Sequence, residues 1–300
     1  MGEKKQFMIE LKEFTLDLKE RYEQLLRDIP TSFYRFSNIY MAKDCSHLHY
    51  AEIDGAFCVV ALPSTSPEDA YGFFPLGAEE AKLRRAFLTL REELGIERFY
   101  VPSEVLPQVE AECPEMFEME ASRGDFDYVY RTQDLIELPG KKYHSKRNHL
   151  SKFTSTYDYE YVSLNGENFS QCQPMMDAWF AEHTDVNTPF FDEEQVIHTL
   201  MDNFDALGLR AGALRVNGEI CAFSIGELTA PDTAHIIIEK ADVRYNGAYA
   251  AINQEFLKNA WADTRFVNRE EDMGHEGLRK AKESYHPVHF NEVYKLTFQK

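Results

Sequence analysis

One stretch of the sequence has the residue types and the spacing of an anion-binding loop. The segment VRYNGAYAAINQEF, residues 243–256, places Arg244 and Gly247 between a strand-like run and a helical one. The first N–H groups of a helix have no internal acceptor and carry partial positive charge, and glycine lets a ligand approach the backbone closely. We therefore expect this loop to hold a phosphate-bearing ligand, with the Arg244 guanidinium as a charged donor. The expected contact residues are Arg244, Tyr245, Asn246, Gly247, Ala248 and Tyr249.

The same stretch also fits a simpler structure, in which Asn246 and Gly247 only cap a helix after a strand. The two interpretations predict different behaviour of Gly247. If the loop holds a ligand, a valine at this position would displace the ligand's phosphates while sparing the fold. If the loop is only a cap, the valine would leave ligand affinity unchanged.

Two groups of polar and charged residues lie at or just after the ends of expected strands, 234–243 and 265–269. An acyl transfer to an amine needs a group that accepts the amine's proton and donors that stabilise a tetrahedral oxyanion. The carboxylates are candidate bases or binding groups for a cationic aminoacyl moiety, and the lysines are candidate donors to a phosphate or an oxyanion. The candidates are Glu239, Asp242, Asn268, Glu271, Asp272, Lys280 and Lys282. The alternative is a solvated charged surface, with Glu239 and Asp242 paired to Lys240 or Arg244.

A basic segment, KKYHSKRNHLSK at residues 141–152, contains no acidic residue although the chain has a net charge of -19. Such a local patch can hold the phosphates of coenzyme A, of a tRNA acceptor end or of a lipid headgroup. By helical spacing we expect Lys142, Lys146 and Arg147 to supply these cations. The alternative is a solvated helix face.

The overall composition excludes several classes of protein. A chain of 300 residues with a pI of about 5.0 is not expected to bind nucleic acid or anionic membrane over its whole surface. It has no apolar run long enough to span a membrane and no uninterrupted apolar core of a signal peptide, which predicts a cytoplasmic protein. No P-loop lysine motif, nucleophile elbow or G-x-G-x-x-G dinucleotide motif is present.

The metal-ligating residue types do not form a convincing site. The five cysteines are scattered, and the chain has no C-x-x-C, which argues against a zinc ribbon and a disulfide framework. His47 and His49 place two imidazoles on one strand face, but no third ligand is suggested nearby. We expect no metal and no tightly bound cofactor.

The elements that must position these residues follow one order in both halves of the chain: hairpin, strand, turn, helix, strand. In the second half, the Asn217-Gly218 hairpin at 209–228 precedes the strand 234–243, the helix after 247, the strand 265–269, a helix at 275–285 and a last strand at 291–298. Before them come a helix at 141–153, a strand at 159–164 and helices at 171–183 and 192–207, the last capped by Asp192.

In the first half, a hairpin at 48–62 turns at Asp54-Gly55, and a strand at 71–77, a helix at 78–95 and a strand at 98–102 follow. Leu83, Phe87, Leu90 and Leu94 share one face of that helix. The repeated order indicates a duplication, with a junction near Pro139-Gly140. We therefore expect an α/β (α+β) fold of two domains, 1–138 and 139–300, each with a mixed sheet flanked by helices. FFPLGAEEA in the first half lacks an arginine, so the first domain is expected to be degenerate.

The second-half order and the Arg244-x-x-Gly247 loop resemble the Gcn5-related N-acetyltransferases (GNAT), although Tyr249 replaces the last small residue of the loop. Four stretches more closely resemble the soluble family similar to the C-terminal part of phosphatidylglycerol lysyltransferase. They are residues 32–42, 140–153, 239–256 and 267–287. This resemblance implies a tandem GNAT-like fold related to the Fem-type aminoacyltransferases, which take amino acids from charged tRNA.

The resemblance also implies roles for individual residues. Glu239 would be the general base beside an acyl carbonyl held where the sheet splays, and Tyr285 would be the general acid for a departing thiolate. The expected function is transfer of an acyl or aminoacyl group from acyl-CoA or aminoacyl-tRNA to an amine or hydroxyl by direct attack. One alternative is a non-catalytic GNAT-like module that senses a phosphorylated ligand. Another is a protein that docks to membranes or tRNA through residues 141–152 without chemistry.

Overall fold

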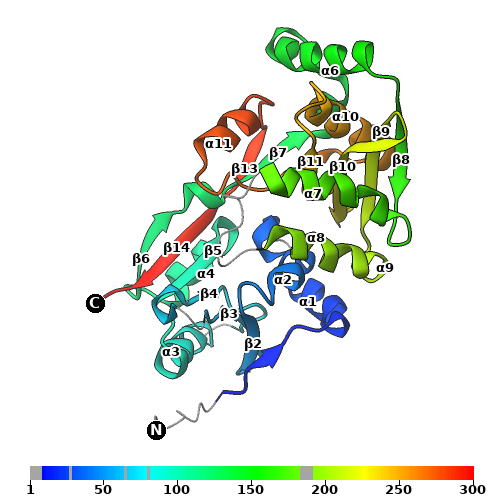
Figure 1. Cartoon of the computed structure of the whole chain (residues 1–300). Helices are drawn as coiled ribbons and strands as arrows, with labels where there is room; N and C mark the ends of the chain where they lie inside the picture. The colour runs from blue at the N-terminus through cyan, green and yellow to red at the C-terminus, as the bar shows by residue number, and fades with distance from the viewer. Residues whose placement is uncertain (1–8, 27–28, 64–65, 80–81, 183–191) are drawn as a thin grey trace. The chain divides into compact units, whose positions relative to one another are not determined.

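A computed structural model of the chain describes residues 9–26, 29–63, 66–79, 82–182 and 192–300. The chain forms two compact units, one made of Met1–Asp125 with Asn291–Lys300 and the other of Phe126–Phe290. Each unit contains a seven-stranded mixed sheet with helices against it (Figure 1). The tandem α/β architecture expected from the sequence is therefore confirmed.

The first unit is built on a sheet with the strand order β1-β2-β3-β4-β5-β14-β6. Its strands are β1 (Lys12–Glu13), β2 (Leu48–Ile53), β3 (Ala56–Ala61), β4 (Tyr71–Phe73), β5 (Arg98–Pro102), β6 (Phe117–Ala121) and β14 (Val293–Phe298). Its helices are α1 (Lys19–Leu26), α2 (Phe36–Ala42), α3 (Leu83–Leu94) and α4 (Leu106–Glu112). Leu83, Phe87 and Leu90 are buried on one face of α3, as their spacing predicts, and Leu94 at its end is half-buried. Residues 80 and 81, at the expected start of this helix, lie outside the described residues.

The second unit is built on a sheet with the strand order β13-β7-β12-β11-β10-β9-β8. Its strands are β7 (Asp127–Arg131), β8 (Tyr159–Leu164), β9 (Arg210–Val216), β10 (Glu219–Ala230), β11 (Thr233–Ala241), β12 (Phe266–Asn268) and β13 (His289–Asn291). Its helices are α5 (Thr132–Glu137), α6 (His144–Thr156), α7 (Gln173–Glu182), α8 (Glu193–Asp202), α9 (Phe204–Leu207), α10 (Ala248–Ala260) and α11 (Glu276–Glu283).

Both predicted hairpins form, and their turns have the expected backbone. Asn217 and Gly218 have φ values of 51° and 87°, and Asp54 and Gly55 have φ values of 50° and 91°. Two consecutive positive φ values match the right-handed twist of the flanking strands, and Asn, Asp and Gly tolerate them best. Asp192 also caps α8 as expected, because its side chain accepts a hydrogen bond from the Gln195 N–H at 3.1 Å.

Each sheet contains one strand that the order of elements along the chain would not place in that sheet. The last strand, β14, hydrogen-bonds between β5 and β6 in the first unit rather than ending the second sheet. The strand β7, which the sequence analysis does not identify, hydrogen-bonds to β12 in the second sheet. The units consequently divide at residues 125 and 290, and the boundary expected after residue 138 falls inside the second unit.

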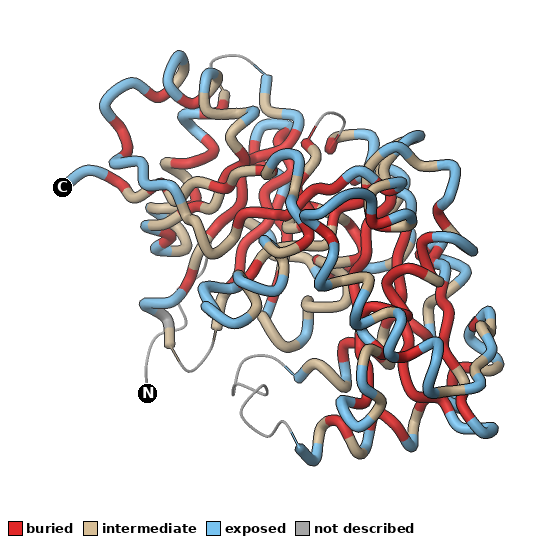
Figure 2. The backbone as a smooth tube through the Cα atoms, turned by 90° about the horizontal axis from the view of Figure 1, so that it is seen from above, coloured by how far each residue is buried: buried red, intermediate tan, exposed pale blue. Residues whose placement is uncertain are grey.

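The second sheet is incompletely paired beside β11. The β11 residues Ala234 to Ile238 are all buried. Figure 2 colours the backbone by burial and shows the buried stretches in red. Nearly the whole length of β11 pairs with β10, but only Thr233 to His235 pair with the parallel strand β12. The remainder of β11 therefore has an edge that β12 does not cover, and residues after β12 lie beside it.

The helix α10 packs on β9, β10 and β11 on one side and contacts α5 and α6 as well (Figure 1). The spacing of Ala248, Ile252, Phe256 and Ala260 predicts one apolar face. The first three are buried, and Ala260 is half-buried. Several further α10 residues are buried too, because the helix is covered both by the sheet and by other helices. The loop that precedes α10, residues 242–247, thus lies at the junction of β11, α10 and α6.

Candidate functional site

The uncovered edge of β11 holds a buried ion pair. The Arg269 Nη2 atom lies 2.7 Å from Glu239 Oε1, and each side chain is 13% exposed. Asn253 Nδ2, from α10, donates to the other carboxylate oxygen of Glu239 at 3.0 Å. Because both oxygens are engaged, Glu239 is placed to orient the guanidinium of Arg269, which is a different task from the proton-accepting role that the resemblance implies.

Arg269 was not singled out from the sequence, yet it is the central residue of this cluster. Its guanidinium carbon lies 4.9 Å from the ring centroid of Tyr285 and 5.8 Å from that of Tyr130. Its second terminal nitrogen, Nη1, is buried and has no hydrogen-bond acceptor in the part of the chain that the structure describes. A buried charged donor without an acceptor is costly, and such a group commonly marks a place where a ligand oxygen binds.

Tyr285 and Lys146 complete the cluster. The Lys146 Nζ atom lies 3.8 Å from the ring centroid of Tyr285. Burial, with the nearby charge of Arg269, lowers the pKa of Lys146 to about 8, although Glu239 acts in the opposite direction. Burial raises the pKa of Tyr285 to about 12, so its hydroxyl stays protonated at neutral pH and can serve as a proton donor.

The predicted phosphate loop is largely satisfied internally. The Asp242 carboxylate accepts from the Arg244 backbone N–H at 2.9 Å and from the Arg244 side chain, with Nη2 to Oδ2 at 2.6 Å. The N–H groups of Tyr245 and Ala248 donate to the carbonyl oxygens of Asp242 and Tyr245. Arg244 is thus already paired, and hydrogen bonding to Arg244 lowers the pKa of Asp242, so that the carboxylate is a poor proton acceptor.

Gly247 is required by packing. Its φ is 92°, and a Cβ atom on it would lie 2.2 Å from the carbonyl oxygen of His149 in α6. A side chain at this position would push α6 away from the loop. The expectation that a branched residue at 247 would spare the fold is therefore wrong, because the glycine lets two parts of the backbone meet.

The Tyr249 hydroxyl is hydrogen-bonded near the end of β11. It accepts a hydrogen bond from Trp179 Nε1 at 3.2 Å. Lys240 lies beside this pair, with Nζ 3.6 Å from the Trp179 ring centroid and 2.7 Å from Glu193 Oε2. Lys240 therefore forms its ion pair with Glu193 of α8. It does not pair with Glu239 or Asp242, the two partners considered from the sequence.

The residues after β12 form a separate charged network. Asp272 is fully buried, accepts from Tyr128 Oη at 2.6 Å and pairs with Arg279. These donors outweigh its burial and lower the pKa of Asp272 to about 2. Asn268 Nδ2 donates to Asp127 at 2.7 Å. Asp272 and Asn268 therefore stabilise the loop. Glu271 is the carboxyl of this segment whose pKa is raised by burial, to about 8.

Two lysines predicted to meet the ligand have different environments. Lys282 Nζ donates to the carbonyl oxygen of Arg269 at 2.6 Å and to that of Glu271, so it fixes the backbone beside the cluster. Lys280 pairs at 2.6 Å with Glu276 one turn away on α11, and both side chains are mostly exposed. Of these two residues, Lys282 is the one that the structure places next to Arg269.

The basic segment contributes one residue to the cluster. Arg147 donates to the carbonyl oxygens of Leu138 and Gly140, and Lys142 lies 3.8 Å from Asp134. These two contacts secure the chain between α5 and α6. Of the three predicted cations, Lys146 lies against Tyr285. Lys142 precedes α6 and lies near Asp134 of α5, and Arg147 is engaged by the carbonyl oxygens of Leu138 and Gly140.

A buried triad next to the segment that carries Arg269 was also not identified from the sequence. His235 is fully buried, with Nδ1 3.1 Å from Glu227 and Nε2 2.9 Å from Glu270. Burial lowers the pKa of His235, but the two carboxylates outweigh it and raise the value to about 9. The triad ties β10 and β11 to the segment that carries Arg269. The spacing between the three residues is too long for a local motif to reveal it.

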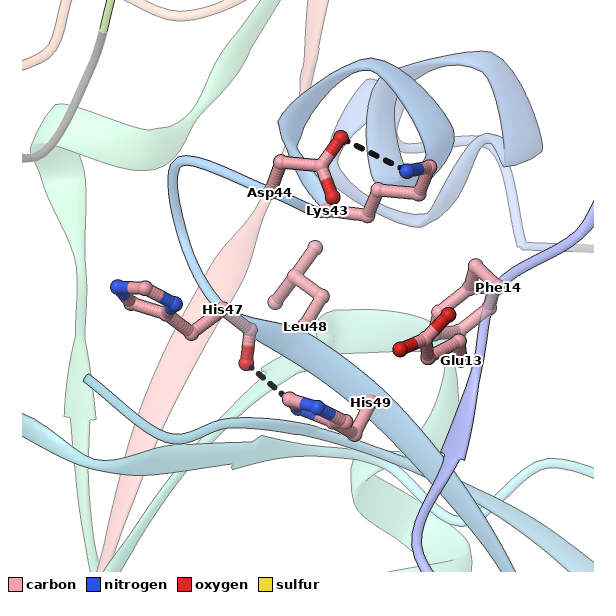
Figure 3. Close-up of a pocket in the computed structure, with 7 residues that line it drawn as sticks. All are labelled: Glu13, Phe14, Lys43, Asp44, His47, Leu48 and His49. Atoms are coloured by element: carbon pink, nitrogen blue, oxygen red, sulfur yellow. Dashed lines mark hydrogen bonds and ion pairs between the residues drawn. The ribbon is translucent and has the colours of Figure 1, made fainter. Parts of the chain in front are cut away.

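Two cavities lie away from the ion-pair cluster. The larger, about 250 Å³, lies in the first unit and is lined by Glu13, Phe14, Lys43, Asp44, His47, Leu48 and His49 (Figure 3). His49 Nδ1 lies 3.0 Å from the His47 carbonyl oxygen, and Lys43 pairs with Asp44. A much smaller cavity, about 10 Å³, lies beside the loop and is lined by Ala178, Trp179, Glu182, Asp242, Val243 and Arg244.

Neither a metal site nor a membrane span is found in the described ranges. No three histidine, cysteine, aspartate or glutamate side chains among those residues are arranged to hold a metal ion. Likewise, none of the helices described has the length and apolar character needed to cross a membrane.

The chain has the fold of tandem GNAT proteins. A tandem GNAT protein from the clavulanic acid biosynthesis pathway matches with a TM-score of 0.51 at 11% identity, covering 97% of this chain and 98% of that one. FemX matches with a TM-score of 0.63 at 8% identity, covering 95% and 96%. At these identities the similarity shows the fold alone.

The sequence family is more specific. The family model described as phosphatidylglycerol lysyltransferase, C-terminal, matches residues 27–297, and the chain belongs to this family. A conserved protein of unknown function from Bacteroides thetaiotaomicron is 32% identical, with a TM-score of 0.85 and coverage of 97% of this chain and 100% of that one. No curated protein matches this chain.

Proposed function

We propose that the second unit transfers an acyl or aminoacyl group, from acyl-CoA or aminoacyl-tRNA, to an amine or hydroxyl by direct attack. The observation that supports this most is the buried, acceptor-free Nη1 atom of Arg269 beside the uncovered edge of β11. A carbonyl oxygen bound there would receive a charge-assisted hydrogen bond that strengthens as the oxygen becomes an oxyanion. Membership of a family described as lysyltransferase is consistent with this chemistry.

In this proposal, each side chain has one task. Arg269 binds the carbonyl oxygen and Glu239 positions Arg269 by occupying its other terminal nitrogen. Tyr285, which remains protonated, donates a proton to the leaving group. Glu271 is the carboxyl proposed to accept the acceptor's proton, because Lys282 donates to its backbone carbonyl and to that of Arg269, which places the two residues side by side. Burial raises the pKa of Glu271, so a smaller fraction is ionised at neutral pH, but that fraction is a stronger base than an ordinary carboxylate. Attack is direct, because no activated nucleophile is evident in the sequence.

The donor's phosphates are not assigned to the loop at 244–249. The N–H groups of Arg244, Tyr245 and Ala248 already have acceptors, and Gly247 faces the His149 carbonyl. A phosphorylated donor would instead meet the exposed cations of the basic segment, such as Lys141 and Lys152, in line with the expected patch.

The test compares Arg269→Gln with Arg265→Gln. Coenzyme A, acetyl-CoA and a non-hydrolysable lysyl-adenosine are titrated against each protein by calorimetry, well below the unfolding temperature. We expect the donor that binds the wild type to lose at least tenfold in affinity in Arg269→Gln, because the charged donor to its carbonyl is gone. Arg265, which is exposed and lies over Phe266, is the control and should retain wild-type affinity. Equal affinity in both variants would refute the assignment.

A non-catalytic binding module is the second candidate, and one residue favours it. Tyr249 stands where the resembling acetyltransferase loop has a small residue, and the Trp179 Nε1–H donates to its hydroxyl at 3.2 Å, so the ring is held beside the loop. A module of this kind would bind the donor without turnover. Incubating the protein with acetyl-CoA or a lysyl ester and mixed amine acceptors, followed by mass spectrometry of the acceptors, separates the two functions.

A further inference from the structure

The buried triad of Glu227, His235 and Glu270 has no task in the proposed function, yet it lies next to the residue on which that function depends. The His235 side chain is fully buried, and the side chains of Glu227 and Glu270 are 8% and 20% exposed. Glu227 belongs to β10, His235 to β11 and Glu270 to the segment after β12. The triad therefore connects two neighbouring strands to the segment that carries Arg269.

The two contacts of His235 define the protonation of its ring. Nδ1 lies 3.1 Å from a Glu227 oxygen, and Nε2 lies 2.9 Å from a Glu270 oxygen. A neutral imidazole has one bare nitrogen, and an ionised carboxylate only accepts, so one of these contacts would have no proton between its atoms. Because an imidazole is more basic than a carboxylate, the required proton belongs to the ring. His235 is therefore an imidazolium that donates to both glutamates.

The backbone of Glu270 explains why this residue needs an anchor. Its φ is 56°, in the left-handed region that residues with a Cβ atom seldom adopt. A residue keeps such a conformation only where its surroundings fix it. The Glu270 N–H donates to Asn268 Oδ1 at 2.8 Å, and its carbonyl oxygen accepts from the Tyr128 N–H at 3.1 Å. With His235 on the carboxylate, both the backbone and the side chain of Glu270 are fixed.

Arg269 and Glu270 are consecutive residues, and each is bound by a side chain of β11. Glu239 lies 2.7 Å from the Arg269 guanidinium, and His235 lies 2.9 Å from the Glu270 carboxylate. The Arg269 N–H also donates to the Tyr128 carbonyl oxygen at 3.0 Å. A change in the φ of Glu270 would move the peptide that it shares with Arg269, and the guanidinium would shift along the uncovered edge of β11.

We propose that His235 is a positioning residue for Arg269. The imidazolium binds the Glu270 carboxylate and so maintains the left-handed turn that directs Arg269 Nη1 to the ligand oxygen. Because His235 is fully buried, it acts through Glu270 and does not contact the ligand. The inference rests on the proposed function for the identity of that ligand, whereas the anchoring of Glu270 is tested without a ligand.

The charge on His235 is tested first, on the wild-type chain alone. In 15N spectra of the histidine side chains at pH 7, both ring nitrogens of His235 should carry a proton, as the two carboxylate contacts require. A His235 ring with one bare nitrogen at pH 7 would overturn the proposal.

The pH dependence of stability tests the same charge. Among the described residues, the charged groups that face the ring are Glu227 of β10 and Glu270, while Asp127 of β7 is bound by Asn268. Burial lowers the pKa of His235, but the two glutamates outweigh it and raise the value to about 9.

A pKa raised in the folded state stabilises the fold fully below the ordinary value of about 6.5 and progressively less as the pH rises through about 9. The free energy of unfolding of the wild type should therefore exceed that of His235→Gln by less and less over this range. Urea denaturation at several pH values measures this difference. A difference that stays constant or grows with pH would contradict the imidazolium.

The link to Arg269 is tested at Glu270, by calorimetry with acetyl-CoA or the lysyl-adenosine analogue, whichever binds the wild type. Glu270→Ala should weaken binding by about tenfold or more, because the turn loses its anchor and Arg269 is displaced. Glu270→Gln should stay within about threefold of the wild type, because its amide oxygen still accepts from His235. Thr132→Val is the control. It removes a buried hydrogen bond to Thr264, before β12, and should leave affinity unchanged.

Two results with the donor would overturn the proposal. One is wild-type affinity in Glu270→Ala. The other is an equal loss in Glu270→Ala and Glu270→Gln, which would show that the charge of Glu270 matters and its anchoring does not. If the wild type binds neither donor, the proposed transferase fails, and hydrogen exchange of the Arg269 amide decides the role of His235. Exchange should become faster in Glu270→Ala but not in Glu270→Gln, and unchanged exchange in both variants would refute the anchoring.

Discussion

Glu239 and Arg269 illustrate how a single buried ion pair sets the chemistry of the site. Removing two charges from water is costly, and their mutual attraction offsets this cost only when the geometry and the remaining hydrogen bonds are good. Glu239 meets that condition, with Arg269 on one oxygen and Asn253 on the other. Arg269 meets it only in part, because Nη1 has no acceptor in the described ranges. A ligand oxygen would remove this deficit.

At this scale we predict an asymmetric double-mutant cycle. Glu239→Ala should lower the free energy of unfolding by about 3–5 kcal/mol, because it leaves the buried guanidinium uncompensated. Adding Arg269→Met should recover part of that loss, since the uncompensated charge is removed. Urea denaturation at pH 7 measures both variants.

The control for this cycle is the pair formed by Glu160 and Arg215, whose side chains are 61% and 23% exposed. Glu160→Ala should cost less than about 1 kcal/mol, because solvent screens the pair. If Glu239→Ala costs no more than Glu160→Ala, the ion pair is not buried in solution and the role given to Arg269 is unsupported.

The junction of α6 with the loop before α10 constrains how the second unit packs. Gly247 lets the loop come within contact of the His149 carbonyl, and Phe153 of the same helix is fully buried there. This packing places Lys146 on the face of α6 that meets Tyr285. Loss of the junction would therefore affect stability and the ligand-facing cluster together.

A matched pair of glycines tests the junction. Gly247→Ala and Gly218→Ala both place a side chain at a positive φ, 92° and 87°. Only Gly247 has a neighbour, the His149 oxygen at 2.2 Å from the added Cβ, whereas a Cβ on Gly218 meets nothing within 4 Å. We expect Gly218→Ala to cost about 1–2 kcal/mol from backbone strain alone and Gly247→Ala to cost clearly more. Thermal unfolding of both variants measures the loss of stability. Equal losses would show that α6 moves aside without an energetic cost.

At the scale of the whole molecule, the two sheets depend on strands that are distant in the chain. The strand β14 has hydrogen-bonded neighbours on both sides, β5 and β6, so it is an interior strand of the first sheet. An interior strand contributes two ladders of hydrogen bonds and two sets of cross-strand side-chain pairs. The last ten residues are therefore structural.

We predict that a chain ending at residue 290 loses the first sheet and retains the second. Hydrogen exchange should show lost protection for β5 and β6, because their backbone groups no longer have β14 as a partner. Protection in β10 and β11, which pair with each other, should persist. A chain ending at Phe298 retains all of β14 and is the control. Unchanged protection of β5 in the shorter chain would contradict the assigned strand order.

The sequence by itself determined the features that rest on local interactions. Asn217-Gly218 and Asp54-Gly55 specify hairpins because their residues tolerate positive φ, and Asp192 caps α8 because its carboxylate reaches an N–H three residues on. Side-chain spacing likewise assigned the buried faces of α3 and α10. The family motifs then indicated the tandem fold, which comparison confirmed.

Only the tertiary structure decided which of the candidate residues meet. Lys146, Glu239 and Tyr285 were singled out for separate reasons, and Arg269 joins them because β12 pairs with only the start of β11. The exchange of β7 and β14 between the sheets is equally invisible in the sequence. Strand pairing, ion pairing and the desolvation of charges depend on distances across the fold, and the order of residues along the chain does not specify those distances.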